Sequence, residues 1–107
     1  MKRVTLITGA SRGIGAATAR LCAADGHAVA INYRSDAEAA ERVRTEIESA
    51  GGTGIAVQGD TGIEADILRM FETVDQALGT VTGLVNNAGI HGPRGRLDVL
   101  GADDISR

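Results

Sequence analysis

The sequence has a single cysteine, no excess of basic residues and no long apolar run, and each absence narrows the class of protein. One cysteine, Cys22, among 107 residues excludes internal disulfide bonds and fits a reducing cytoplasm. The net charge of −3 argues against nucleic acid or an anionic membrane as the main partner. No stretch approaches the roughly 18 apolar residues that a membrane span requires. Two histidines and one cysteine offer no metal-ligand spacing. We therefore expect a cytoplasmic protein without metal, nucleic acid or membrane partners.

What the sequence does contain is an alternation of short apolar runs and helical patterns. The apolar runs predict strands at residues 4–7, 28–32 and 55–57, and a fourth beginning at 84–85. Three- and four-residue spacing predicts a helix after each of the first three strands. The expected buried faces of these helices are Ile14, Ala17, Leu21 and Ala24, then Ala40, Val43, Ile47 and Ala50, then Ile67, Met70, Phe71, Val74 and Leu78.

This alternation predicts the α/β class, as one Rossmann-type doubly wound parallel sheet with helices on both faces over residues 1–107. Ser35-x-x-Glu38 and Thr61-x-x-Glu64 are expected to be capping boxes that begin the second and third helices. Residues 90–101 show no periodicity, and residues 102–107 are expected to open a further helix. The sheet is therefore expected to stop after about four strands, with the fourth at an edge. An unpaired edge strand favours self-association, so we expect a homo-oligomer or a longer chain.

Glycines are concentrated between the first strand and the first helix, at Gly9, Gly13 and Gly15. A tight turn there needs positive φ angles, and a diphosphate approaches the backbone only where no Cβ intrudes. The helix that follows directs its free N–H groups and its positive dipole end at the phosphates. We therefore predict a cradle for the pyrophosphate of a dinucleotide; an ordinary tight strand–helix turn is the alternative.

Two motifs together resemble the short-chain dehydrogenase/reductase family. The first is Thr8-Gly9-Ala10-Ser11-Arg12-Gly13-Ile14-Gly15, and the second is Asn86-Asn87-Ala88-Gly89 at the end of the fourth strand. The resemblance runs over essentially the whole chain and implies an oxidoreductase that transfers hydride between a nicotinamide cofactor and a small-molecule carbonyl or alcohol. It also implies cofactor contacts from Gly9, Ser11, Arg12, Gly13, Ile14, Gly15, Asn87, Ala88 and Gly89.

The charges near the end of the second strand indicate which coenzyme is preferred. An NAD site usually places an acid there, about 20 residues after the glycines, to bind the ribose 2′-hydroxyl. Here Tyr33, Arg34 and Ser35 stand in that region, and Arg12 lies in the glycine turn. Two guanidiniums can pair with a 2′-phosphate, so we expect NADP, as in the NADP-preferring branch of the family. Solvated surface arginines are the alternative, and the neighbouring Asp36 is expected to act only in its local capping box.

The remaining expected contacts come from the resemblance. Asp60 matches the family aspartate that contacts the adenine amino group, and the backbone N–H of Thr61 serves the same contact; a plain turn is the alternative. His91 borders the substrate space or is a solvent-exposed loop residue. Cys22 is expected to be a packed core thiol.

No residue matches the family's catalytic serine, tyrosine, lysine and asparagine. The single tyrosine, Tyr33, lies at the adenosine end and has no lysine four residues later. We therefore expect the N-terminal, cofactor-binding part of a longer reductase, inactive by itself. A non-catalytic NADPH-binding or interaction module is the main alternative. A third alternative is an S-adenosylmethionine-dependent methyltransferase. It is disfavoured because such an enzyme normally has an acid, which binds the ribose hydroxyls, where Tyr33 and Arg34 stand here.

Overall fold

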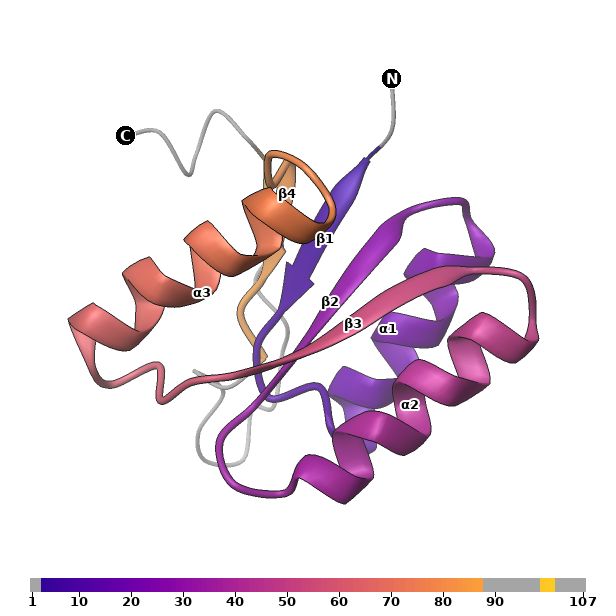
Figure 1. Ribbon diagram of the computed structural model, residues 1–107. Helices are drawn as coiled ribbons and strands as arrows, with labels where there is room; N and C mark the ends of the chain where they lie inside the picture. The colour runs from indigo at the N-terminus through magenta and orange to yellow at the C-terminus, as the bar shows by residue number, and fades with distance from the viewer. Residues whose placement is uncertain (1–2, 88–98, 102–107) are drawn as a thin grey trace.

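The computed structural model describes residues 3–87 and the backbone of residues 99–101 (Figure 1). Strands and helices alternate along the chain, as the sequence patterns predict, and the expected strands lie within a few residues of their observed positions. In chain order the elements are β1 (Val4–Ile7), α1 (Gly13–Ala24), β2 (Ala28–Tyr33), α2 (Ala37–Ser49), β3 (Thr53–Gln58), α3 (Glu64–Ala77), β4 (Gly83–Val85) and β5 (Val99–Gly101).

The strands form one sheet in the order β3-β2-β1-β4-β5. The first four are parallel, with Leu6 of β1 opposite Ala30 of β2 and Leu84 of β4. This confirms the Rossmann-type α/β class. The expectation that β4 forms an edge is wrong, because β5 pairs with it antiparallel, Leu84 opposite Leu100. A three-residue strand is too short to produce a detectable periodicity, which is why residues 90–101 gave no strand signal.

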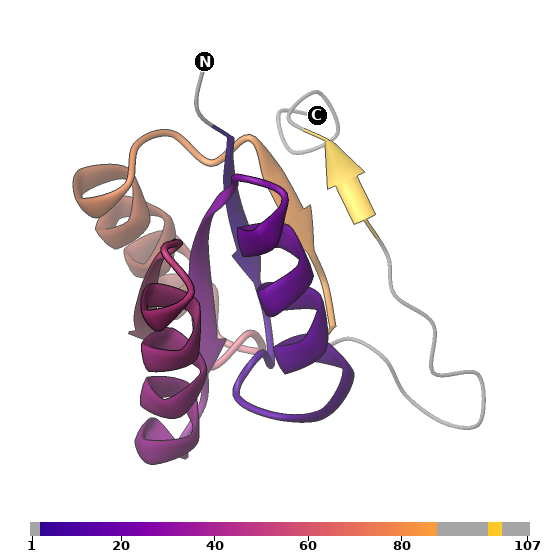
Figure 2. The same cartoon turned by 90° about the vertical axis from the view of Figure 1, so that its right-hand side faces the viewer.

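Helices cover the two faces of the sheet in separate layers: α1 and α2 lie on one side and α3 on the other (Figure 1). Figure 2 shows the molecule from the side of α1 and α2. Successive side chains of a strand point to opposite faces. Ile7 therefore packs under α1 and α2, while its neighbour Leu6 packs under α3. Burial on both faces explains why β1 and β2 read as continuous apolar runs rather than alternating ones.

The buried face of α1 differs from the expected one. Gly15, Ala16 and Ala19 face the sheet, whereas the predicted stripe of Ile14, Ala17, Leu21 and Ala24 is exposed. Ile14 is 55% exposed and Leu21 72%. Small residues let the helix axis approach β1 and α2 closely, and this packing requirement outweighs the larger apolar area of the other face. Cys22, expected to be a packed core thiol, is only partly buried against this layer, and burial raises the pKa of its thiol.

The other two helices follow their predicted faces more closely. Val43 and Ile47 of α2 are buried, and Ala50 is exposed at the end of that helix. Met70 and Val74 of α3 are fully buried, with their predicted neighbours Ile67, Phe71 and Leu78 partly buried beside them.

Neither expected capping box forms. The N-cap of α2 is Asp36, whose side chain accepts a hydrogen bond from the N–H of Ala39 (3.0 Å), so Ser35 lies one residue too early. Helix α3 begins at Glu64 after Ile63, which has no side-chain cap. Thr61 does not cap it, because Asp60 already organises the turn by accepting from the N–H of Gly62 (2.8 Å). A carboxylate is a stronger hydrogen-bond acceptor than a hydroxyl, and in both turns the acceptor is a carboxylate, that of Asp36 before α2 and that of Asp60 before α3.

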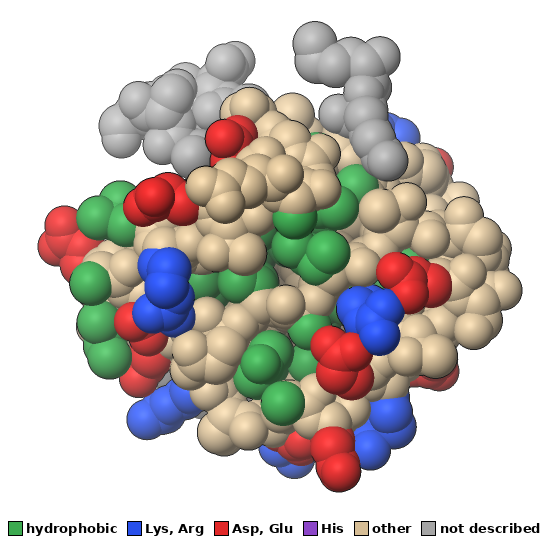
Figure 3. All heavy atoms as spheres, in the orientation of Figure 1, with side chains coloured by type: hydrophobic (Ala, Val, Ile, Leu, Met, Phe, Trp, Pro, Cys, Tyr) green, Lys and Arg blue, Asp and Glu red, His purple; other side chains and the backbone are tan. Residues whose placement is uncertain are grey.

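Acidic and basic side chains are interspersed over the face seen in Figure 3. Arg44 of α2 pairs with Glu41 and Glu48 of the same helix. Among the described residues, no helix has the length and apolar character needed to cross a membrane.

Candidate functional site

The glycine turn connects the end of β1 to the first turn of α1, beside the carboxyl ends of β2 and β4. The Thr8 N–H donates to the carbonyl of Val85 (3.0 Å), and its hydroxyl donates to the side chain of Asn86 (3.2 Å). The Ala10 N–H donates to the carbonyl of Asn32 (2.9 Å). The turn is therefore held from both neighbouring strands.

The three glycines have different physical roles. Gly9 and Gly13 adopt left-handed backbone angles, with φ of 60° and 62°. Gly15 has an ordinary helical conformation, but a Cβ there would lie 2.5 Å from the carbonyl oxygen of Gly9 and 2.5 Å from the Asn87 amide. At Gly13 a Cβ would meet no described atom within 4 Å. Gly15 thus permits close packing of helix on turn, while the surface at Gly13 is open to a ligand.

The beginning of α1 has the character of an anion site. Its N-cap is Arg12, in an extended conformation, and no side chain caps the helix. No acidic residue lies in the first turn, whereas the first turns of α2 and α3 contain Glu38 and Glu64. The first N–H groups of a helix have no partners within it, and its dipole favours negative charge there. An anion placed at the turn would meet both effects.

The segment after β4 supports the turn directly. The Asn87 side chain donates to the carbonyl of Gly9 (2.9 Å), so the second motif and the glycine turn are in contact. Ala88, Gly89 and His91, which the sequence also placed near the site, lie outside the described residues.

The two arginines expected near a 2′-phosphate each pair with an acid. Arg12 lies 3.3 Å from a carboxylate oxygen of Asp36, and the Arg34 Nε lies 3.5 Å from Asp60. Their side chains are 78% and 80% exposed. Exposed pairs of this kind contribute less than about 1 kcal/mol, so a phosphate can displace them. The expectation that Asp36 acts only locally is wrong, because it caps α2 and also reaches Arg12 in the glycine turn.

The other predicted residues at this end lie close by. Tyr33 ends β2 and is half-buried against the layer of α1 and α2. Ser35 lies in the turn between Arg34 and Asp36. A groove of about 450 Å³ between α1 and α2 begins at Ser11, Arg12 and Gly13.

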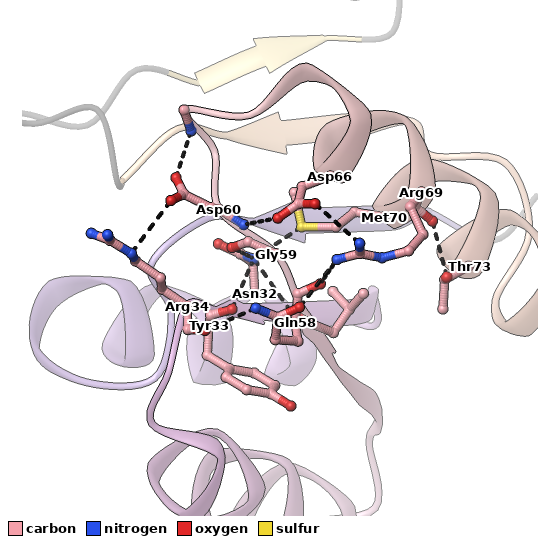
Figure 4. A network of polar contacts seen from close by, with 12 residues as sticks. Asn32, Tyr33, Arg34, Gln58, Gly59, Asp60, Asp66, Arg69, Met70 and Thr73 are labelled. Carbon is pink, nitrogen blue, oxygen red and sulfur yellow. Dashed lines mark hydrogen bonds and ion pairs between the residues drawn. The ribbon is translucent and has the colours of Figure 1, made fainter.

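The loop between β3 and α3 is ordered by a chain of polar contacts (Figure 4). The Asp60 N–H donates to Asp66 (2.9 Å), which pairs with Arg69 (3.0 Å). The hydrogen bond from Asp60 holds the pKa of Asp66 below its ordinary value of 3.8, with Arg69 adding to the effect and partial burial opposing it. Thr61 lies in this loop and borders a small cavity of about 140 Å³ together with Thr8 and Asn86.

One residue at the site was missed by the sequence analysis. Asn32, in β2, is 2% exposed and contacts the glycine turn on one side and the end of β3 on the other. The only signal in the sequence is a polar amide within an otherwise apolar strand, which could have been read as a buried polar anchor.

The parallel strands therefore bring four predicted groups together at their carboxyl ends: the glycine turn, the Tyr33–Ser35 segment, the Asp60–Thr61 loop and Asn87. Ligands of open α/β sheets bind at this edge, where the strand order reverses between β1 and β4. Within the part of the chain that the structure describes, no group of three or more His, Cys, Asp or Glu side chains could hold a metal. The arrangement suits an extended, anionic organic ligand.

Comparison with known proteins agrees with this geometry. Residues 3–106 match the family model described as short chain dehydrogenase. The chain belongs to the short-chain dehydrogenase family. This confirms the family resemblance found in the two motifs and accounts for the Rossmann-type sheet order.

Relatives within the family are oxidoreductases and reductases. An uncharacterized oxidoreductase, YgfF of Escherichia coli K12, is 41% identical over 104 residues, which is 97% of this chain and 42% of that protein. The 1-cyclohexenylcarbonyl-CoA reductase of Streptomyces collinus is 41% identical over 81% of this chain and 31% of its own length. The chain thus spans less than half the length of these relatives.

Solved structures of similar proteins have the same fold. A dehydrogenase/reductase from Sinorhizobium meliloti 1021 matches with a TM-score of 0.79 and 43% identity over 82% of this chain and 35% of that one. The angucycline C-6 ketoreductase LanV, whose crystal structure contains bound NADP, matches with a TM-score of 0.74 and 37% identity over 82% of this chain and 37% of its own.

Proposed function

We propose that this chain is the cofactor-binding part of an NADP(H)-dependent short-chain dehydrogenase that transfers hydride between the nicotinamide and a small-molecule carbonyl or alcohol. The observation that carries the proposal is the glycine turn at the uncapped N-terminus of α1, tied to β4 by Asn87. When bound, the dinucleotide supplies the hydride. The chain's own residues hold its pyrophosphate through backbone N–H groups and keep the turn in one position.

Preference for NADP over NAD is supported by the charges at the end of β2. Arg12 and Arg34 flank this end, and Tyr33 stands where an acid would repel a 2′-phosphate. Asp36 and Asp60 hold the two guanidiniums in place by weak exposed pairs. A dianionic phosphate competes effectively with a single carboxylate for such a guanidinium. NADP bound to the similar ketoreductase LanV supports the same choice.

The first prediction tests the coenzyme assignment with Arg12→Ala and Arg34→Ala. Each substitution removes a charge-assisted contact worth about 1.5–3 kcal/mol, so the Kd of NADPH should rise roughly 10- to 150-fold. The Kd of NADH, which has no 2′-phosphate, should stay nearly constant. Titration of the intrinsic fluorescence of the reduced coenzymes measures both constants.

Arg44→Ala is the matched control, because Arg44 is paired on the outer surface of α2 with Glu41 and Glu48. It should change neither constant. Equal losses for NADPH and NADH in the Arg12 or Arg34 variant, or no loss at all, would refute the role proposed for the 2′-phosphate.

We further propose that the chemical step depends on residues beyond this segment, so that the 107 residues alone are inactive. The proposal rests on the missing catalytic pattern, since the one tyrosine of the sequence, Tyr33, ends β2 at the adenosine side. A non-catalytic NADPH-binding module would have the same cradle. A Tyr-x-x-x-Lys pattern encoded after residue 107 would favour the enzyme, and an immediate stop codon would favour the module.

A further inference from the structure

The side chain of Asn32 contacts the glycine turn on one side and the end of β3 on the other. Figure 4 shows it beside Gly59 and Met70. Its oxygen accepts a hydrogen bond from the N–H of Gly9 (3.1 Å). Its nitrogen faces the carbonyl oxygens of Gly59 (3.1 Å) and Val57 (3.3 Å), and the sulfur of Met70 (3.0 Å). One small side chain thus connects three segments that are distant in the sequence.

This position requires a carboxamide. The Gly9 N–H needs an acceptor, while the Gly59 and Val57 carbonyls need a donor, and a carboxamide of this length provides both at once. Asn32 is 2% exposed, so water cannot take over either contact. Within the described residues, every buried side-chain nitrogen and oxygen has a hydrogen-bond partner, and the environment is therefore matched to this group.

The two ends of the Asn32 contact belong to different parts of the candidate site. Gly9 opens the turn that would hold the pyrophosphate, and its carbonyl is fixed from the other side by Asn87 (2.9 Å). Gly59 immediately precedes Asp60, whose carboxylate pairs with Arg34 and orders the loop expected at the adenosine. The Asn32 side chain therefore joins the two subsites, next to the backbone hydrogen bonds that the Ala10 N–H donates to the Asn32 carbonyl (2.9 Å) and the Gly59 N–H donates to the Tyr33 carbonyl (3.0 Å).

The surroundings of this link are closely packed. A Cβ at Gly59 would lie 2.5 Å from the sulfur of Met70, which is itself fully buried and in contact with Asn32. The Met70 side chain therefore packs directly against both Gly59 and the Asn32 amide. A displacement of the turn would consequently be transmitted to the cofactor rather than absorbed by the core.

We propose that Asn32 is a positioning residue for the dinucleotide, which sets the glycine turn against the Gly59–Asp60 segment so that pyrophosphate and adenosine bind together. The inference rests on the proposed function, because it concerns the same cofactor. Asn32 touches no part of the cofactor itself and acts through Gly9 and Gly59.

The test compares the Asn32→Asp variant of the 107-residue chain with the wild-type chain, using two ligands. NADPH occupies both subsites, whereas 2′,5′-ADP occupies the adenosine side. The carboxylate of Asn32→Asp can still accept from the Gly9 N–H, but it has no N–H to donate to the Gly59 carbonyl and repels that oxygen. We expect the Kd of NADPH to rise roughly tenfold or more and that of 2′,5′-ADP less than about threefold. Isothermal titration calorimetry measures both.

The pH dependence gives a second readout that a general loss of stability would not produce. Burial favours the neutral form of the introduced carboxyl, and a neutral carboxyl has one acceptor and one donor, like the amide. The ratio of the variant's Kd for NADP to that of the wild type should therefore fall as the pH is lowered from 8 to 5.5. Taking the ratio cancels the ionisation of the coenzyme phosphate.

Thr5→Val is the matched control. Thr5 is also buried, and its hydroxyl contacts His27 (2.6 Å) near the opposite end of the sheet, so its loss removes a buried polar contact away from the site. Both Kd values should stay within about twofold of the wild type. If Asn32→Asp does not fold, Asn32→Ser, which is neutral but too short to span both partners, should show the same split between ligands.

The outcomes separate the two proposals. A wild-type chain that binds neither ligand overturns the proposed function and, with it, the role of Asn32. Wild-type binding with equal losses for both ligands in folded Asn32 variants, or with no loss, overturns the positioning role and leaves the proposed function standing.

Discussion

Single polar residues determine much of this site, and two acids show how. Asp36 caps α2 with one oxygen and holds Arg12 with the other, so it joins a helix start to the glycine turn. Asp66 accepts from the Asp60 N–H and pairs with Arg69. Each carboxylate accepts from a backbone N–H and also pairs with an arginine, and these contacts hold Arg12 and Asp60, two residues expected to contact the cofactor.

A prediction at this scale concerns the acid dependence of stability. The pKa of Asp66 is lowered in the folded protein, chiefly by the Asp60 N–H, so its ionised form stabilises the fold. That contribution is complete above the ordinary value of 3.8 and is lost as the pH falls through the lower folded-state pKa. Urea unfolding should show Asp66→Asn less stable than wild type at pH 7, with the difference shrinking below pH 3.8.

Glu72→Gln, on the exposed side of the same helix, is the control and should change stability little at either pH. A difference for Asp66→Asn that stays constant into strong acid would contradict the assigned cause, because a neutral carboxyl accepts the Asp60 hydrogen bond much more weakly.

At the scale of elements, α1 shows how packing overrides pattern. The helix has two apolar faces, one of small residues and one with Ile14 and Leu21, and both have helical spacing. The small face is buried because the glycine turn, through Gly15, brings the helix against Gly9 and Asn87. Close approach at the start of the helix determines its rotation along its whole length, so the larger residues remain exposed.

Two substitutions in α1 are therefore predicted to differ in their effect on stability. Leu21→Lys changes an exposed position and should alter the free energy of unfolding by no more than about 0.5 kcal/mol. Ala19→Leu adds volume to a fully buried position and should destabilise the protein by about 1–3 kcal/mol. Chemical denaturation of both variants beside the wild type measures the difference. The reverse order would mean that α1 is rotated toward its larger residues.

At the scale of the whole molecule, the candidate site exists only where four strand ends meet. The order β3-β2-β1-β4 places the glycine turn between the segments that follow β2 and β4. Arg12 meets Asp36, and Gly9 meets both Asn32 and Asn87, across separations of 24, 23 and 78 residues. We expect a ligand bound there to contact segments that follow several different strands.

Ligand binding should consequently stabilise the whole chain. NADPH at about 100 times its Kd should raise the free energy of unfolding by about 2.7 kcal/mol, since it binds the folded state alone. Thermal unfolding with and without NADPH measures the effect, and NADH at the same concentration should produce a smaller one. An unchanged melting temperature with NADPH would contradict the proposed function.

The sequence by itself determined the order and type of the first seven elements, the α/β class and the location of the glycine turn. These follow from local properties: apolar runs, helical periodicity and glycine's access to positive φ. The family was also identifiable, because each of its two motifs is an unbroken stretch of sequence, at residues 8–15 and 86–89. Coenzyme preference and the roles of Asp60 and Thr61 remain predictions, which the experiments above address.

Only the tertiary structure decided which face α1 buries, that Asp36 rather than Ser35 caps α2, that β5 covers β4, and that Asn32 joins the glycine turn to β3. Each depends on groups distant in the sequence: the Asn32 amide meets the Gly59 carbonyl 27 residues later, and Leu100 of β5 pairs with Leu84 of β4. Local patterns give the preferences of a segment, but competition among several partners for one buried position is settled by packing in three dimensions.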